Sequence, residues 1–214
     1  MDKSVTRRLT GRCFKMFGGT GLWYIAISLG LHITIFLILS LNVQGFVWQE
    51  NIQQGNSTAM FLFVLGIVWP IIYTPRLIAL GITRRQLWGG MFYAAALICA
   101  AGTAVHALCY ALAAVTGHPV MASIFIPMQA LRDMVIFLYC FLLGWGIAVG
   151  FLYKKVVTAV VSIIAAMLGF GAAAYLIGEP ITLPTLAQIA ALAALGAVIA
   201  WALRLGIKKM PIRA

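Results

Sequence analysis

The sequence predicts an all-α fold, a polytopic transmembrane helical bundle with six spans, and three observations predict it. The 214 residues are 64% hydrophobic and only 9% charged, proportions that water-soluble domains rarely show. The mean hydropathy is +1.05, and apolar runs recur at the roughly 20-residue length that crosses a bilayer. Basic residues gather between these runs. A disordered chain, a secreted disulfide scaffold and a free cytosolic enzyme are therefore excluded.

The spans form one transmembrane domain covering residues 1–214, with connectors too short to hold a soluble domain of ordinary size. A basic amphipathic segment, residues 1–21, precedes the spans, and a basic tail, residues 206–214, follows them. Long apolar runs bounded by polar residues place the six transmembrane helices within 22–205, at 22–41, 59–80, 90–115, 128–152, 156–177 and 186–205.

The basic residues alternate along the chain in a way that predicts orientation. Of the 15 Lys and Arg residues, all but Arg132 lie in the N-terminal segment, at the end of the second run, in the connectors after the second and fourth runs, or near the C-terminus. Basic residues resist translocation, so both termini are expected on the cytoplasmic side of the membrane, in a multi-pass protein. The connectors that contain no Lys or Arg are 42–58, 116–127 and 178–185.

The N-terminal segment combines apolar and basic residues at helical spacing. Val5, Leu9, Cys13 and Met16 recur on one face, and Lys and Arg fill the remainder. This pattern predicts an amphipathic N-terminal interfacial helix in contact with membrane lipids. The alternative is a disordered basic tail attracted to anionic headgroups.

Catalytic motifs are missing from the sequence. It contains no GxxxxGK[ST], HExxH or GxSxG pattern, and its 4 acidic residues form no pair on one span. The 4 cysteines show no CxxC spacing. We therefore expect no enzyme activity, no catalytic residue, no metal and no cofactor in this chain. Membrane topology accounts for the basic charge, so we expect no nucleic-acid partner.

Polar residues inside the spans are costly in a bilayer and are candidates for function by default. Thr103, His106 and Tyr110 share one helical face, and Gln129 can pair with Asp133 one turn away. Hydrogen bonding between helices is favoured over a transport pathway for the histidines, while a snorkelling, substrate-facing or structural role stays open for Arg132. The intramembrane polar candidates are His32, Thr103, His106, Tyr110, Gln129, Arg132 and Asp133.

Small residues and prolines predict how the spans pack and bend. Gly146 and Gly150 form a GxxxG pattern that favours close helix packing within the chain, with a subunit interface as the alternative. Pro70 and Pro75 remove backbone donors near the end of the second span, where we expect a kink.

The connector after the second span carries the most information. Residues 80–90 read LGITRRQLWGG, with a glycine break, a threonine that can cap a helix, two arginines and the apolar pair Leu87 and Trp88. The pattern predicts a short helix lying on the cytoplasmic face. A basic turn with an interfacial Trp anchor is the simpler interpretation.

This string resembles the Leu-Gly-x-Thr/Ser-Arg-Arg-x-Phe/Leu connector of bacterial ABC transporter permeases of the ABC-2 exporter type. Residues 144–155 are similar to the glycine-rich fourth span of that family, whereas the connector 178–185 is shorter than the re-entrant region of many of its members. In the family, this connector forms a coupling helix that docks on a separate ATPase. The resemblance assigns ATPase coupling to Thr83, Arg84, Arg85, Gln86 and Leu87.

The resemblance implies a permease subunit that couples ATP hydrolysis by an ABC ATPase subunit to export of a substrate. It also implies a dimer with a second permease subunit, identical or similar, and ATP-Mg held by the partner ATPase. Two other classes stay open on the residues alone. One is a self-sufficient secondary carrier or channel, and the other is a non-transporting membrane scaffold or immunity protein.

Overall fold

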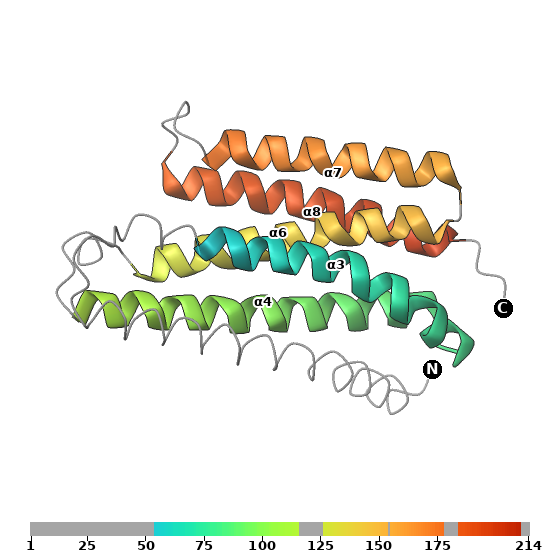
Figure 1. Ribbon diagram of the computed structural model, residues 1–214, viewed down its shortest axis with the longest axis horizontal. Coiled ribbons are helices and arrows are strands. Elements are labelled where there is room, and N and C mark those ends of the chain that lie inside the picture. The colour runs from blue at the N-terminus through green and yellow to red at the C-terminus, as the bar shows by residue number, and fades with distance from the viewer. Residues whose placement is uncertain (1–53, 116–125, 154, 178–183, 211–214) are drawn as a thin grey trace.

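A computed structural model describes residues 54–115, 126–153, 155–177 and 184–210, which form a bundle of long helices (Figure 1). Within these ranges there are 5 helices long and apolar enough to cross a membrane, and no strand. They are α3 (Gln54–Ala79), α4 (Arg84–Val115), α6 (Ile126–Leu152), α7 (Val156–Ile177) and α8 (Thr185–Lys209).

The helical fold and five of the predicted spans are thus confirmed as helices of spanning length. The predicted first span at 22–41, the N-terminal interfacial helix and His32 lie outside the described residues. The bounds of α7 agree with prediction, whereas α3 and α4 each begin several residues before the apolar run does. At these ends polar residues such as Gln54 and Arg84 belong to the helix because its backbone hydrogen bonds continue through them. A hydropathy pattern detects only the apolar part of such a helix.

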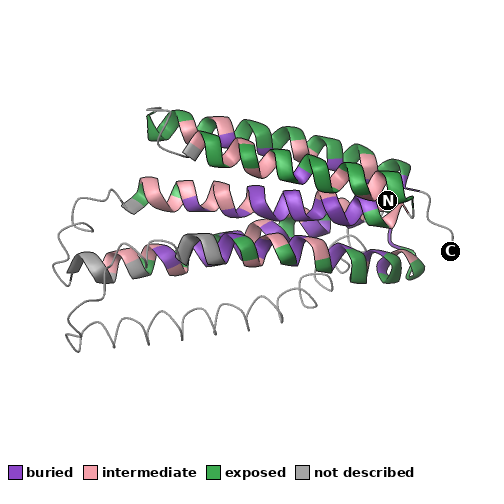
Figure 2. Ribbon diagram, turned by 45° about the horizontal axis from the view of Figure 1, so that its top comes forward, coloured by how far each residue is buried: buried purple, intermediate pink, exposed green. Residues whose placement is uncertain are grey.

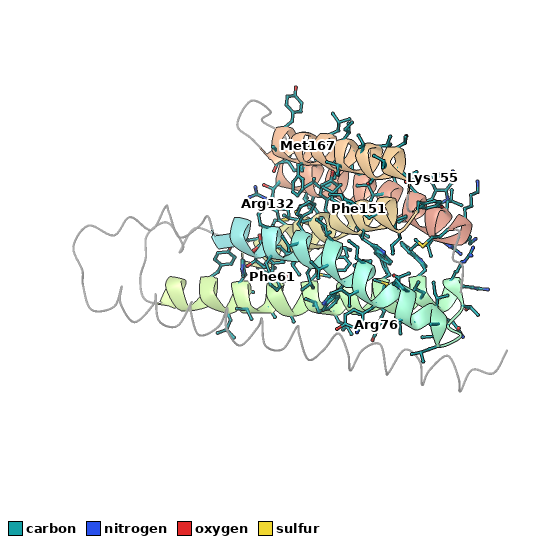
Figure 3. All side chains as sticks on the ribbon, turned by 45° about the vertical axis from the view of Figure 1, so that its right-hand side comes forward. Phe61, Arg76, Arg132, Phe151, Lys155 and Met167 are labelled. Atoms are coloured by element: carbon teal, nitrogen blue, oxygen red, sulfur yellow. The ribbon has the colours of Figure 1, made fainter. Side chains whose placement is uncertain are left out.

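The helices lie side by side along one axis, with α6 in the middle of the bundle (Figure 1). Helix α6 packs against each of α3, α4, α7 and α8. Three features meet at one end of the bundle, namely the α3–α4 connector, the α6–α7 junction and the last turn of α8. We call this the basic end, because Arg76 and Lys155 lie there while Arg132 lies toward the opposite end (Figure 3).

The core of the bundle is built around aromatic residues of α6. Phe137, Phe141 and Trp145 are each only 1% exposed. Trp69 of α3 meets Phe141 edge to face at 6.3 Å between ring centroids. Figure 2 shows the buried residues following α6 and the faces turned toward it, while α7 and α8 are exposed along their outer sides. An exposed apolar surface of this kind suits contact with lipid or with another membrane helix.

Glycines allow the closest approach between α3 and α6. A Cβ added at Gly66 would collide with the Phe141 carbonyl oxygen, and one added at Gly144 would collide with the Phe63 carbonyl oxygen. Because the obstacles are main-chain atoms, neither can rotate away. The two backbones are therefore packed against each other at glycines that the sequence analysis had not singled out.

The predicted GxxxG residues lie at two different contacts. Gly150 packs tightly against Ser162 of α7, whereas the nearest atom to a Cβ at Gly146 would be Leu203 Cδ2 at 4.0 Å. Tyr139 strengthens the α6–α7 contact by donating a 2.8 Å hydrogen bond to the Gly169 carbonyl. Helix α3 continues as one element through its internal prolines, and its last turns bend toward the start of α4 (Figure 1).

Candidate functional site

The connector between α3 and α4 is a tight turn built by a helix stop. Gly81 has a φ of 80°, in the left-handed region that glycine adopts without strain. The Ile82 amide donates to the Leu77 carbonyl at 3.1 Å, and the Gly81 amide donates to the Ile78 carbonyl at 2.9 Å. This pair of bonds is the Schellman arrangement that satisfies the last carbonyls of a helix.

A helix start follows immediately. The Thr83 amide and hydroxyl donate to Gln86 Oε1 at 3.0 and 2.8 Å, and the Gln86 amide donates back to Thr83 Oγ1 at 3.3 Å. This reciprocal capping box confirms the predicted capping role of Thr83. It also begins α4 at Arg84, so the prediction of a separate short helix on the surface is wrong. Residues 84–90 are instead the first turns of α4.

Three side chains hold this corner to the rest of the bundle. Arg84 donates a 2.6 Å hydrogen bond to the Lys208 carbonyl at the end of α8. Leu87 is only 1% exposed, so it packs in the core and is not presented to a partner. Trp88 stacks on Trp145 of α6, with ring centroids 4.8 Å apart.

The remaining connector residues face outward. Thr83 and Arg85 are exposed, and Gln86 is half-buried with its side chain engaged in the capping box. Of the five residues assigned to ATPase coupling, Thr83 and Arg85 therefore form the accessible surface, while Arg84 and Leu87 position it. The connector is thus an exposed basic corner that Arg84, Leu87 and Trp88 anchor to the bundle.

A second group of polar side chains lies toward the opposite end, within the bundle. His106 Nδ1 of α4 lies 3.4 Å from Asp133 Oδ2 of α6, and Tyr110 donates to the same carboxylate oxygen at 3.2 Å. Thr58 Oγ1 of α3 and His106 Nε2 are hydrogen-bonded at 3.1 Å. Gln129 donates to Asp133 Oδ1 at 3.4 Å, as its spacing along the helix predicted. We call these five residues the buried polar cluster.

The buried polar cluster joins the polar face predicted on α4 to the polar residues predicted on α6. It also includes Thr58, which was not predicted. Thr58, His106 and Asp133 are each less than 9% exposed, and they connect α3, α4 and α6. Thr58 was missed because it lies just before the apolar run and its partner is 48 residues away in the sequence. Hydrogen bonds among three helices favour the packing interpretation of these polar residues.

Two other predicted candidates border this cluster. Thr103 donates a 3.8 Å hydrogen bond to the Met134 sulfur, across the α4–α6 contact. Arg132 is half-buried, and within the described part of the chain its buried Nε atom has no hydrogen-bond partner. The described residues contain no group of three or more His, Cys, Asp or Glu side chains placed to hold a metal ion.

Comparison of the chain with protein-family models, with curated proteins and with solved structures finds no match. The functional assignment therefore depends on the residues and geometry described above.

Proposed function

We propose that this chain is the permease subunit of an ABC transporter of the ABC-2 exporter type. In this proposal it dimerises with itself or with a similar permease in a bacterial cell membrane, and a separate ABC ATPase drives export. The observation that carries the proposal is the α3–α4 corner, which presents Thr83 and Arg85 while Arg84, Leu87 and Trp88 fix it to the bundle.

The corner is suited to transmitting force. A load applied at Arg85 passes through the first turn of α4 to α8 by way of the Arg84–Lys208 hydrogen bond. It passes to the central helix α6 through the stacked rings of Trp88 and Trp145. Closure of an ATPase dimer against this corner would then tilt α4, α6 and α8 together, alternating the accessible side of the gap between two permease subunits.

The charge of the corner defines the chemistry of its partner surface. An exposed guanidinium pairs best with carboxylates, often through two parallel hydrogen bonds. We therefore expect Arg85 to meet an acidic surface on the ATPase, and the basic end of the bundle to face the cytoplasm.

Copurification tests the proposal directly. The tagged chain, extracted in mild detergent from its native host, should bring down a P-loop protein that hydrolyses ATP. Arg85→Glu should reduce the ATPase recovered by about tenfold, since it replaces an attraction with a repulsion at the contact. Lys155→Glu is the matched control, because Lys155 is an exposed cation at the same end of the bundle but on the α6–α7 connector.

Equal recovery from both variants, or full transport by the chain alone in proteoliposomes, would count against an ATPase contact at Arg85. The second result would favour the alternative of a self-sufficient carrier. The observation that favours that alternative is the contact between His106 Nδ1 and Asp133 Oδ2, which lie 3.4 Å apart and buried among the helices. In that case Asp133→Asn would abolish transport without any ATPase present.

A further inference from the structure

A cavity of about 270 Å³ opens at the basic end, between the first turn of α4 and the last turns of α8. Four of its lining side chains are cationic, two from each helix. The residues that line it are Arg84, Arg85, Trp88, Gly89, Arg204 and Lys208. Such a concentration of positive charge is unfavourable unless an anion occupies the space.

The described residues supply no anion to this cavity. Their only carboxylate is Asp133, which belongs to the buried polar cluster toward the opposite end of α6. Arg84 uses one donor on the Lys208 carbonyl, a neutral group that leaves its positive charge uncompensated. A bound phosphate would place negative charge among the four cations and accept charge-assisted hydrogen bonds from them.

A second, apolar cavity of about 200 Å³ lies between α6 and α8, with one residue of α4 in its wall. Phe92, one turn beyond Trp88 on α4, lines it, and so does Ala200, one turn before Arg204 on α8. Its other walls include Leu138, Leu142, Gly196 and Ala197. Trp88 of the cationic cavity stacks on Phe92 of the apolar one, with ring centroids 5.6 Å apart, so the two cavities are neighbours.

We propose that these two cavities together bind one anionic phospholipid, with its phosphate among Arg84, Arg85, Arg204 and Lys208 and an acyl chain in the apolar cavity between α6 and α8. The inference does not require the proposed function, but the two share Arg85, so the variants that test the lipid site leave that residue unchanged. A free phosphate compound shares the chemistry of the headgroup, but it leaves the adjoining apolar cavity without a role. A lipid fills both, because its charged and apolar parts are joined end to end in the same order as the cavities.

Native mass spectrometry of the purified full chain, titrated with phosphatidylglycerol in detergent, measures how tightly the site binds this lipid. The double variant Arg204→Gln and Lys208→Gln should bind phosphatidylglycerol about tenfold more weakly than the original chain, because it removes two of the four cations. It retains the Lys208 carbonyl that Arg84 requires. The matched control is Lys155→Gln with Lys209→Gln, which removes two exposed cations at the same end that do not line the cavity.

Filling the apolar cavity distinguishes a lipid headgroup from a free phosphate compound as the bound anion. Ala197 is exposed on α8, so Ala197→Trp should be accommodated without loss of fold while obstructing the acyl chain. This variant should weaken phosphatidylglycerol binding and leave binding of inorganic phosphate unchanged. Thermal unfolding of every variant in the same detergent shows whether the helices remain packed.

Three results would overturn the proposal. Equal weakening by the cavity pair and by the control pair would mean that the lipid responds to net charge and not to this cavity. Displacement of the lipid by millimolar inorganic phosphate, with no effect of Ala197→Trp, would assign the cavity to a soluble anion. Equal affinity for phosphatidylglycerol and phosphatidylcholine would exclude selection for an anionic headgroup.

Discussion

The Arg84 guanidinium donates a 2.6 Å hydrogen bond to the main-chain carbonyl of Lys208, 124 residues further along the chain. The last carbonyls of a helix have no partner within it and carry partial negative charge. Arg84 therefore closes the end of α8 from the first turn of α4. This hydrogen bond therefore ties the first turn of α4 to the last turn of α8 at the basic end.

Arg84→Gln should destabilise the bundle by about 1 kcal/mol, the usual net contribution of one hydrogen bond, because the partly exposed charge is screened by solvent. The shorter side chain cannot span to α8. Thermal unfolding in detergent, followed by circular dichroism, measures the loss. Arg85→Gln is the control, because its exposed side chain makes no described contact with α8 and its replacement should leave the unfolding temperature unchanged. Equal losses would show that charge, and not the Lys208 contact, matters.

Thr83→Ala should cost about 1 kcal/mol by removing the N-cap of α4. Gln86→Ala should cost a similar amount, because the two side chains bond each other and each other's amides. Since both variants break the same capping box, their combination should cost clearly less than the sum. A double-mutant cycle on unfolding free energies tests this, and additive losses would contradict a shared capping box.

Gly144→Ala should destabilise the α3–α6 pair by about 2 kcal/mol or more, because the new methyl group meets the Phe63 carbonyl and main-chain atoms cannot move aside. Gly66→Ala should behave alike against Phe141. The control lies two residues along α6. Gly146→Ala meets its nearest neighbour at 4.0 Å and should be neutral or slightly stabilising, since alanine favours helix. A larger loss at Gly146 than at Gly144 would be inconsistent with this packing.

Thr58→Val should cost about 1 kcal/mol, within the range measured for hydrogen bonds between membrane helices. The substitution conserves shape but removes the hydroxyl that bonds His106. Combining it with Asp133→Asn should show positive coupling, because His106 lies between the two residues. Independent effects in the unfolding free energies would mean that these side chains do not act as one network.

Thiol labelling tests which end of the bundle faces the cytoplasm. In a chain with its native cysteines replaced, Arg85→Cys should react with an impermeant reagent only after the cells are permeabilised. Pro127→Cys, exposed at the start of α6 toward the opposite end, should react on intact cells. Reaction of Arg85→Cys on intact cells would contradict an ATPase contact at this corner. The native cysteines are Cys13, Cys99, Cys109 and Cys140.

Sequence patterns predicted the helices well because the length of an apolar run is itself the physical requirement for crossing a bilayer. They also predicted contacts within one helix, such as Gln129 with Asp133, because the helical repeat determines which residues are neighbours. The helix stop at Gly81 and the cap at Thr83 were readable for the same reason, although their combined effect, a turn leading directly into α4, was not.

Contacts between helices could not be predicted in the same way. The bond from Thr58 to His106 and that from Arg84 to Lys208 depend on which helices become neighbours and at what height they meet. The periodicity of a single segment determines neither its neighbouring helices nor the height at which it meets them. Likewise, Gly66 and Gly144 are two among 21 glycines, and only the crossing of α3 over α6 distinguishes them.

The stacked indoles of Trp88 and Trp145, 4.8 Å apart with 21° between their planes, also provide an intrinsic spectroscopic probe of the contact between α4 and α6. Contact between two indole rings changes their fluorescence and circular dichroism, so the signal of this pair should change when the rings separate. Any rearrangement that parts α4 from α6 at the basic end is therefore visible without a dye, in the unmodified chain and in real time.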